Sequence, residues 1–181
     1  MIALLAGIAA VAVPLVLLTS LFGQVRRPSA VAGALRAQRV FPAPFAGAVA
    51  AAVIAAEAVA GLAGAVALLL WLDGPMRVTS GAAAVLLGLY ALYGAYVSRT
   101  RRGAPCGCAG AGTPMTGWVA GRAAAFSGLA VVGALHGLPA GSTAYELFIA
   151  VVAGLGFAAI LWTLPHAMAR ESMAQERRTA G

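Results

Sequence analysis

The chain has 181 residues, of which 62% are hydrophobic and 9% charged, whereas soluble proteins have about 45–50% apolar and about 25% charged residues. So few charges cannot cover a water-facing surface, which excludes a soluble globular domain, and the high hydrophobicity excludes a disordered chain. The formal net charge of +7 comes from basic residues between apolar stretches, so it indicates membrane orientation with lipid as the partner rather than a nucleic acid.

Five apolar stretches are each long enough to cross a hydrocarbon core of about 30 Å as a helix. In chain order they cover residues 2–22, 45–72, 78–97, 118–138 and 145–164. We expect the first to be a retained helix rather than a signal peptide, because no basic residue precedes Arg26. The sequence therefore predicts an all-α, polytopic transmembrane helical bundle. It forms a single domain over residues 1–165, followed by a polar tail at 166–181.

Two patterns within these spans predict how the helices sit. Small residues recur at every fourth position of the second span, and we expect them to form one close-packing face: Ala48, Ala52, Ala56, Ala60 and Gly64. Tyrosines end the third span, where we expect them to anchor the helix at the membrane–water interface: Tyr90, Tyr93 and Tyr96.

The two cysteines, Cys106 and Cys108, lie in a polar segment rich in glycine and proline between the third and fourth spans. The intervening Gly107 allows the tight bend that a disulfide would need, and so small a ring is expected to be strained and readily exchanged. Nearby arginines and the amino end of the next helix are expected to lower the pKa of a thiol. We therefore predict an accessible redox pair that acts in thiol–disulfide exchange.

Two other readings of the cysteines stay open. Two thiolates are too few for a closed zinc site, and neither His136 nor His166 is near them in sequence. A low-coordinate Cu(I) site, with Met115 as a further ligand, is the competing hypothesis. In the other open reading, the chain is a structural membrane subunit and the two thiols have no chemical role.

Glu57 is the other residue that suggests chemistry. It lies about twelve residues into the second span, near mid-bilayer, where an ionisable group costs about 3 kcal/mol. Such a group should face protein, be protonated or meet a cation. Arg122, one turn into the fourth span, enters from the same side, and we predict that both residues support the site. The alternative function is a bundle that handles a small molecule or metal, with Glu57 as the proton-linked or ligand group and with copper held by Cys106 and Cys108. A quinone is the other candidate cofactor.

Several segments resemble one family of membrane proteins. The segment 22–28, after the first span, is similar to that family's Gly-x-x-Lys-x-x-x-Pro-like segment, and 39–42 resembles its proline motif before the second helix. Cys106-Gly-Cys108-Ala-Gly resembles its Cys-Gly-Cys-Phe-Gly signature. Glu57 and Arg122 fall where the family has a glutamate and an Arg-Asn pair. The family is MauE (methylamine utilisation), within the DoxX-like group.

The resemblance implies a helper role. MauE proteins are linked to the maturation of methylamine dehydrogenase, whose small subunit is rich in disulfides, together with a thioredoxin-like partner. By that analogy Cys106 and Cys108 would relay electrons or disulfides between such a partner and a client, either methylamine dehydrogenase-like or other. The chain departs from the family at Ala109, which replaces Phe, and at Ala123, which replaces Asn. A role that needs the Asn is not implied for this chain.

The charges predict a topology that conflicts with this role. Five spans place ten arginines on one side, and Arg77 alone lies on the other. The positive-inside rule then places Cys106 and Cys108 on the cytoplasmic face of a bacterial plasma membrane. Stable disulfides and the implied role favour the opposite face. The sequence favours the cytoplasmic side by charge and leaves the conflict open. The ten are Arg26, Arg27, Arg36, Arg39, Arg99, Arg101, Arg102, Arg170, Arg177 and Arg178.

Overall fold

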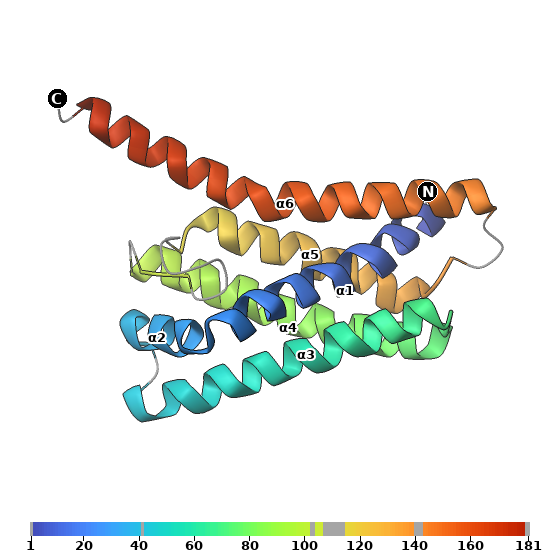
Figure 1. Cartoon of the computed structure of the whole chain (residues 1–181), viewed down its shortest axis with the longest axis horizontal. Helices are drawn as coiled ribbons and strands as arrows, with labels where there is room; N and C mark the ends of the chain where they lie inside the picture. The colour runs from blue at the N-terminus through green and yellow to red at the C-terminus, as the bar shows by residue number, and fades with distance from the viewer. Residues whose placement is uncertain (1, 41, 102–103, 107–114, 140–142, 180–181) are drawn as a thin grey trace.

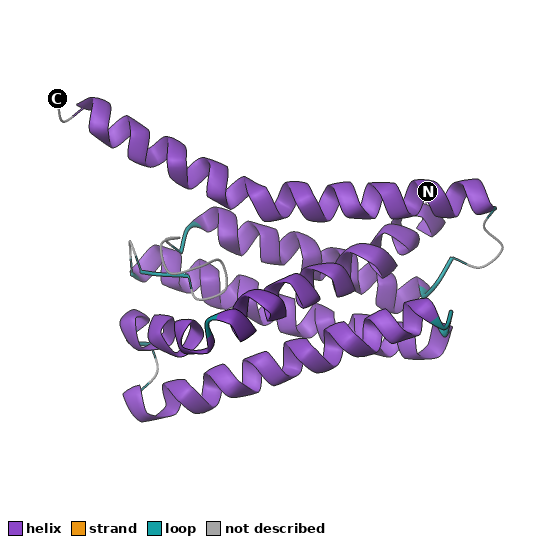
Figure 2. Cartoon of the chain, in the orientation of Figure 1, coloured by secondary structure: helices purple, strands orange, loops and turns teal. Residues whose placement is uncertain are grey.

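The computed structural model of the chain describes residues 2–40, 42–101, 104–106, 115–139 and 143–179. They form helices α1 (Ile2–Arg26), α2 (Pro28–Gln38), α3 (Ala46–Leu69), α4 (Asp73–Thr100), α5 (Gly117–His136) and α6 (Ala144–Thr179), with a 3₁₀ turn η1 (Ala43–Phe45) (Figure 1). Within these residues, five helices are long and apolar enough to span a membrane. This confirms the predicted all-α membrane bundle. Figure 2 shows that the connecting loops gather at the two ends of the bundle.

Helix α1 lies at the centre and packs against α3, α5 and α6, while α4 packs most closely against α5 (Figure 1). Its Leu17 is buried in a cluster with Leu87 of α4 and Phe126 of α5. The Phe126 ring also meets Phe157 of α6 edge to face, with ring centroids 5.7 Å apart. Aromatic pairs prefer this arrangement, and the contact joins α6 to α5.

Small residues let the helices approach closely, but not along the predicted face of α3. A Cβ added to Gly64 would lie 3.1 Å from Cγ of Pro14 on α1, which is a tight contact, so this crossing favours a residue without a side chain. Ala60 is buried beside it. The prediction was wrong for the other members of the face, which are exposed: Ala48, Ala52 and Ala56.

Helix α2 was not predicted, because its residues were assigned to the loop after the first span. Pro28 occupies the start of the helix, where its missing N–H and fixed φ fit well. Val31 and Leu35, four residues apart on one face, are buried against Ala46 and Ala50 of α3. The short helix therefore closes one end of the bundle.

Helix α6 extends farther than the predicted span 145–164. Its backbone stays helical from Ala144 to Thr179, and Figure 1 shows its C-terminal part leaving the other helices. At its start, Thr143 and Glu146 form a reciprocal cap: Thr143 N donates to Glu146 Oε2 at 2.9 Å, and Glu146 N donates to Thr143 Oγ1 at 3.3 Å. The division into a domain over 1–165 and a tail at 166–181 stays a prediction.

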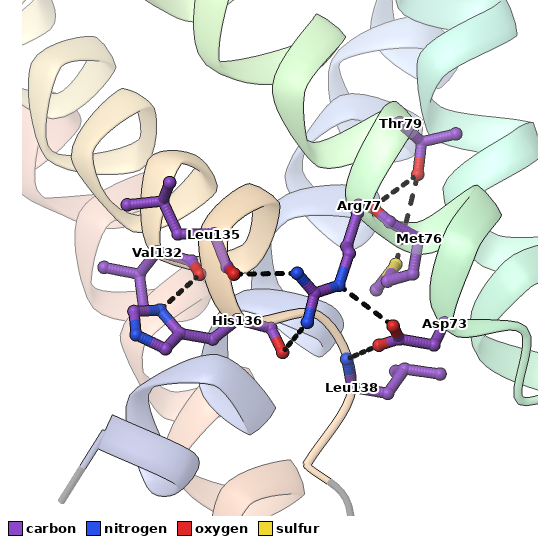
Figure 3. A network of polar contacts seen from close by, with 8 residues as sticks. All are labelled: Asp73, Met76, Arg77, Thr79, Val132, Leu135, His136 and Leu138. Atoms are coloured by element: carbon purple, nitrogen blue, oxygen red, sulfur yellow. Dashed lines mark hydrogen bonds and ion pairs between the residues drawn. The ribbon is translucent and has the colours of Figure 1, made fainter.

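The end of the bundle opposite α2 carries a polar network around Arg77 (Figure 3). Its guanidinium donates to the carbonyl oxygens of Leu135 at 2.9 Å and His136 at 3.0 Å. Asp73 lies 2.9 Å from Arg77 Nε and also accepts the backbone N–H of Leu138 at 2.8 Å. These contacts satisfy carbonyls that have no partner within α5 and place a positive charge at its negative end. Arg77 therefore has a structural role.

Candidate functional site

The carboxyl of Glu57 lies inside the bundle rather than against lipid. The side chain is 1% exposed, and its Oε2 accepts a hydrogen bond of 2.5 Å from Gln24 Nε2 on α1. The same Nε2 donates to Ser20 Oγ at 3.0 Å, and Tyr90 of α4 lies beside the carboxyl. We call these four residues the Glu57 cluster. Three helices thus converge on a group that a lipid-facing position could not tolerate.

The amide of Gln24 is oriented by these contacts. Because its Nε2 donates both to Glu57 and to Ser20, the amide oxygen Oε1 must point elsewhere. This oxygen is buried, and none of the described residues donates a hydrogen bond to it. A buried carbonyl oxygen without a donor costs about 1–3 kcal/mol, so a donor from outside the chain would relieve an existing penalty.

The Glu57 cluster opens onto a cavity of about 390 Å³. Helices α1 to α5 and Met115 contribute to its wall, which is mostly aliphatic. Seven polar side chains also line it: Ser20, Gln24, Gln38, Glu57, Tyr90, Tyr93 and Arg122. The structure therefore brings Glu57 and Arg122 to one cavity. The hydrogen bonds of Glu57 are made within its own cluster, and a shared role of Glu57 and Arg122 stays a prediction.

Gln38 of α2 connects this cavity to the cysteine-bearing segment. Its side chain is 2% exposed; its Oε1 accepts a hydrogen bond of 2.6 Å from Tyr93 OH, and its Nε2 donates to Pro105 O at 2.8 Å. Met115, which lines the cavity, donates its backbone N–H to Ala104 O at 2.7 Å. The two ends of the segment are thus fixed beside the cavity.

Cys106 follows Pro105 directly and is fully buried. The expectation of an accessible thiol was therefore wrong for Cys106, and Gln38 holds the preceding residue, Pro105. Cys108 lies outside the described residues, so a bond between the two sulfurs stays a prediction.

Metal binding has no further support from the part of the chain that the structure describes. No group of three His, Cys, Asp or Glu side chains within it is placed to hold an ion. His136, considered as a ligand from the sequence, lies at the opposite end of the bundle, where its Nδ1 is 3.2 Å from Val132 O (Figure 3).

Several residues of the site were missed from sequence. Tyr90 and Tyr93 were assigned to interface anchoring, but both line the cavity. Ser20 and Gln24 were not singled out, although two polar residues four apart in an apolar helix share a face. That spacing was the available signal. The sequence carried no comparable signal for Gln38, because its segment was predicted to be a loop.

One comparison with known proteins gives a match. The family model described as methylamine utilisation protein MauE matches residues 2–136. The match covers α1 to α5 and every residue of the cavity wall, and leaves α6 outside. Neither the curated proteins nor the solved structures contain a match.

Proposed function

Since the chain belongs to the MauE family of membrane proteins, we propose that it supports the disulfide maturation of a partner protein through Cys106 and Cys108. The client is methylamine dehydrogenase-like or another disulfide-rich protein, and a thioredoxin-like protein is the second partner. We place the chain in the bacterial plasma membrane as a multi-pass protein, and its relation to the DoxX-like group belongs to the same proposal.

The observation that supports this proposal best is the tethering of the cysteine segment by Gln38. The bond from Gln38 to Pro105 O fixes the residue next to Cys106 beside the cavity that Glu57 lines. The same end of the bundle carries exposed Arg99 and Arg101, which favour a nearby thiolate.

The exchange proceeds in two steps. A client thiolate attacks the sulfur of Cys108 in the Cys106–Cys108 disulfide, which forms a mixed disulfide and releases Cys106 as a thiolate. A second client thiolate then displaces Cys108, so the client gains one disulfide and the pair becomes a dithiol. We assign the attacked sulfur to Cys108 because Cys106 is fully buried, and attack requires access to the sulfur.

Trapping the mixed disulfide tests this function. A Cys106→Ser variant, quenched with acid and alkylated in intact cells, should carry a partner on Cys108 that mass spectrometry identifies after a non-reducing gel. The matched Cys108→Ser variant should trap none. If neither variant traps a partner and the double variant supports client maturation as the wild type does, the proposal is wrong.

A second candidate function is small-molecule handling through Glu57, and the cavity favours it. In that case Glu57→Gln would abolish function in a protein that still folds, while changing both cysteines to Ser would not. Copper handling would instead require Cys106 and Cys108, and copper titration of the purified protein would then show binding that the double Ser variant lacks.

A further inference from the structure

We propose that the cavity between α1 and α5 binds the head group of a zwitterionic lipid with a primary ammonium, of the phosphatidylethanolamine type. The ammonium donates to Gln24 Oε1 and lies beside the carboxyl of Glu57. The observation that points to a ligand is this buried amide oxygen, to which none of the described residues donates. The binding does not depend on the exchange function, because no cysteine is among the described residues of the cavity wall.

The Glu57 cluster lies near the level of the lipid head groups. Gln24 is two residues before Arg26, where α1 ends, so it lies about 3 Å along the helix axis from that end. Arg122, on the same cavity wall, is five residues after Gly117, where α5 begins. The ends of membrane-spanning helices lie at the interface. A head group therefore reaches the cluster without crossing the apolar centre of the bilayer, where the position of Glu57 within its own span would place it.

The cavity is open to the bilayer at this level. Leu89 of α4 lines it and is 57% exposed on the outer face of the bundle, and the next residue is Tyr90 of the Glu57 cluster. The volume of about 390 Å³ falls within the range of about 300–1,000 Å³ that small-molecule sites occupy. It is smaller than a whole two-chain lipid, so the head group enters and the acyl chains stay in the bilayer.

The acceptors at the cluster favour a primary ammonium. Gln24 Oε1 and the Glu57 carboxyl belong to one hydrogen-bonded pair, and an ammonium has three N–H donors and a positive charge with which to serve both. A single hydroxyl can donate to only one of them. A choline head group is fully methylated and has no N–H, so it would leave the amide oxygen buried without a donor.

The charges of the wall favour a zwitterion. Among the described residues of the wall, Glu57 is formally negative and Arg122 formally positive, so the wall is neutral overall. A lipid with one ammonium and one phosphate keeps the site neutral. A simple cationic amine or an anionic phospholipid would instead bury a net charge, which is costly.

Binding is measured by native mass spectrometry of the delipidated full-length protein in detergent. The protein is titrated separately with dioleoylphosphatidylethanolamine, dioleoylphosphatidylcholine and dioleoylglycerol, which share their acyl chains and differ in the donors of the head group. We expect the ethanolamine lipid to bind about tenfold more tightly than the choline lipid, because only the first donates to Gln24 Oε1. Dioleoylglycerol, with one hydroxyl and no charge, should also bind more weakly than the ethanolamine lipid.

Two matched variants separate the cavity from the outer surface, where lipids bind without selection. Ala123→Leu fills the cavity, since Ala123 lines it, whereas Ala124→Leu adds the same group on the exposed face of α5. Ala123→Leu should weaken binding of the ethanolamine lipid by about tenfold, and Ala124→Leu should leave it within about twofold. Gln24→Leu, tested in protein that keeps the helical circular dichroism of the wild type, should bind the ethanolamine and choline lipids equally.

Equal binding of the ethanolamine and choline lipids by the wild type would overturn the proposal, as would unchanged binding in Ala123→Leu. Tighter binding of dioleoylglycerol than of the ethanolamine lipid would overturn the assignment of an ammonium.

A cysteine-free variant keeps this inference distinct from the exchange function. Cys106→Ser/Cys108→Ser should prefer the ethanolamine lipid as the wild type does, and loss of the preference in this variant would contradict a site without cysteines. If the wild type shows no preference while the mixed disulfide is still trapped, the lipid inference is wrong and the exchange function stands. If the preference is present and no mixed disulfide is trapped, the lipid site stands and the exchange function is wrong.

Discussion

Gln24 Nε2 lies 2.5 Å from Glu57 Oε2 and thereby joins α1 to the middle of α3 across 33 positions of sequence. The contact explains how an apolar helix carries an ionisable residue: the carboxyl faces protein, with Ser20 and Tyr90 beside it. It also fixes the unpartnered oxygen of Gln24 at the edge of the cavity. The bundle thus holds a polar centre that packing alone does not require.

Removing the Gln24 amide should destabilise the bundle. Gln24→Ala leaves the buried carboxyl of Glu57 without its closest donor, which we expect to cost about 1–3 kcal/mol. Thr19→Ala is the matched control, because Thr19 is exposed and its hydroxyl donates to Leu15 O of its own helix. Unfolding of both variants in mixed detergent micelles, followed by circular dichroism, measures the difference. Equal stability of the two variants would contradict a structural role for this bond.

Gly137 should not tolerate a side chain. It adopts φ 68°, and an added Cβ would lie 2.7 Å from Arg77 Nε and clash with Asp73. We expect Gly137→Ala to destabilise the protein by about 1–3 kcal/mol. Gly128, in the middle of α5, has open space around it, so Gly128→Ala should be neutral or stabilising by up to about 1 kcal/mol. A thermal melt of both variants that showed no difference would refute the packing described for this end.

Asp73 should protect the backbone amide of Leu138 from hydrogen exchange. Its carboxylate accepts that N–H at 2.8 Å, so Asp73→Ala should speed exchange in the peptide around Leu138 by about tenfold. Glu146→Ala removes a comparable capping carboxylate from Thr143 and should leave the Leu138 peptide unchanged. Hydrogen exchange with mass spectrometry distinguishes the two, and a slow Leu138 amide in Asp73→Ala would count against the network.

Gln38 should control the reactivity of Cys106. Gln38→Leu removes the bond to Pro105 O, so the segment should open more often and expose the sulfur. We expect alkylation of Cys106 by N-ethylmaleimide to be about tenfold faster or more. The control is Ala37→Leu on the exposed face of α2. Rates read by mass spectrometry in a Cys108→Ser background, if identical in the two variants, would show that Gln38 does not hold the segment.

The membrane spans could be predicted from sequence because span length and hydrophobicity are set by the bilayer itself. The internal packing could not. Helix α3 is so rich in alanine that small side chains lie on every face, so a row of small residues does not identify the packing face. The face that is buried carries Glu57, and the row through Ala52 and Ala56 is exposed. Helix α2 was missed because its large buried apolar residues, Val31 and Leu35, form too short an apolar stripe to stand out.

Only the charged residues of the site could be predicted from the sequence. Glu57 and Arg122 stand out in apolar spans, and both line the cavity. The uncharged polar residues around them gain meaning only when α1, α2 and α4 come together. Cys106 was expected to be exposed because polar loops normally lie on the surface. The structure buries Cys106 instead, and nothing in the local sequence indicates the tertiary bond from Gln38 to Pro105 beside it.

A redox titration of the wild-type protein tests most directly whether the sulfurs of Cys106 and Cys108 form an exchanging pair. Membranes equilibrated in graded glutathione buffers, alkylated and digested, report the Cys106–Cys108 bond by mass spectrometry. We predict a reversible transition between about −270 and −120 mV, where exchanging thiol–disulfide proteins operate. Two thiols that remain fully alkylated across this range would contradict the account.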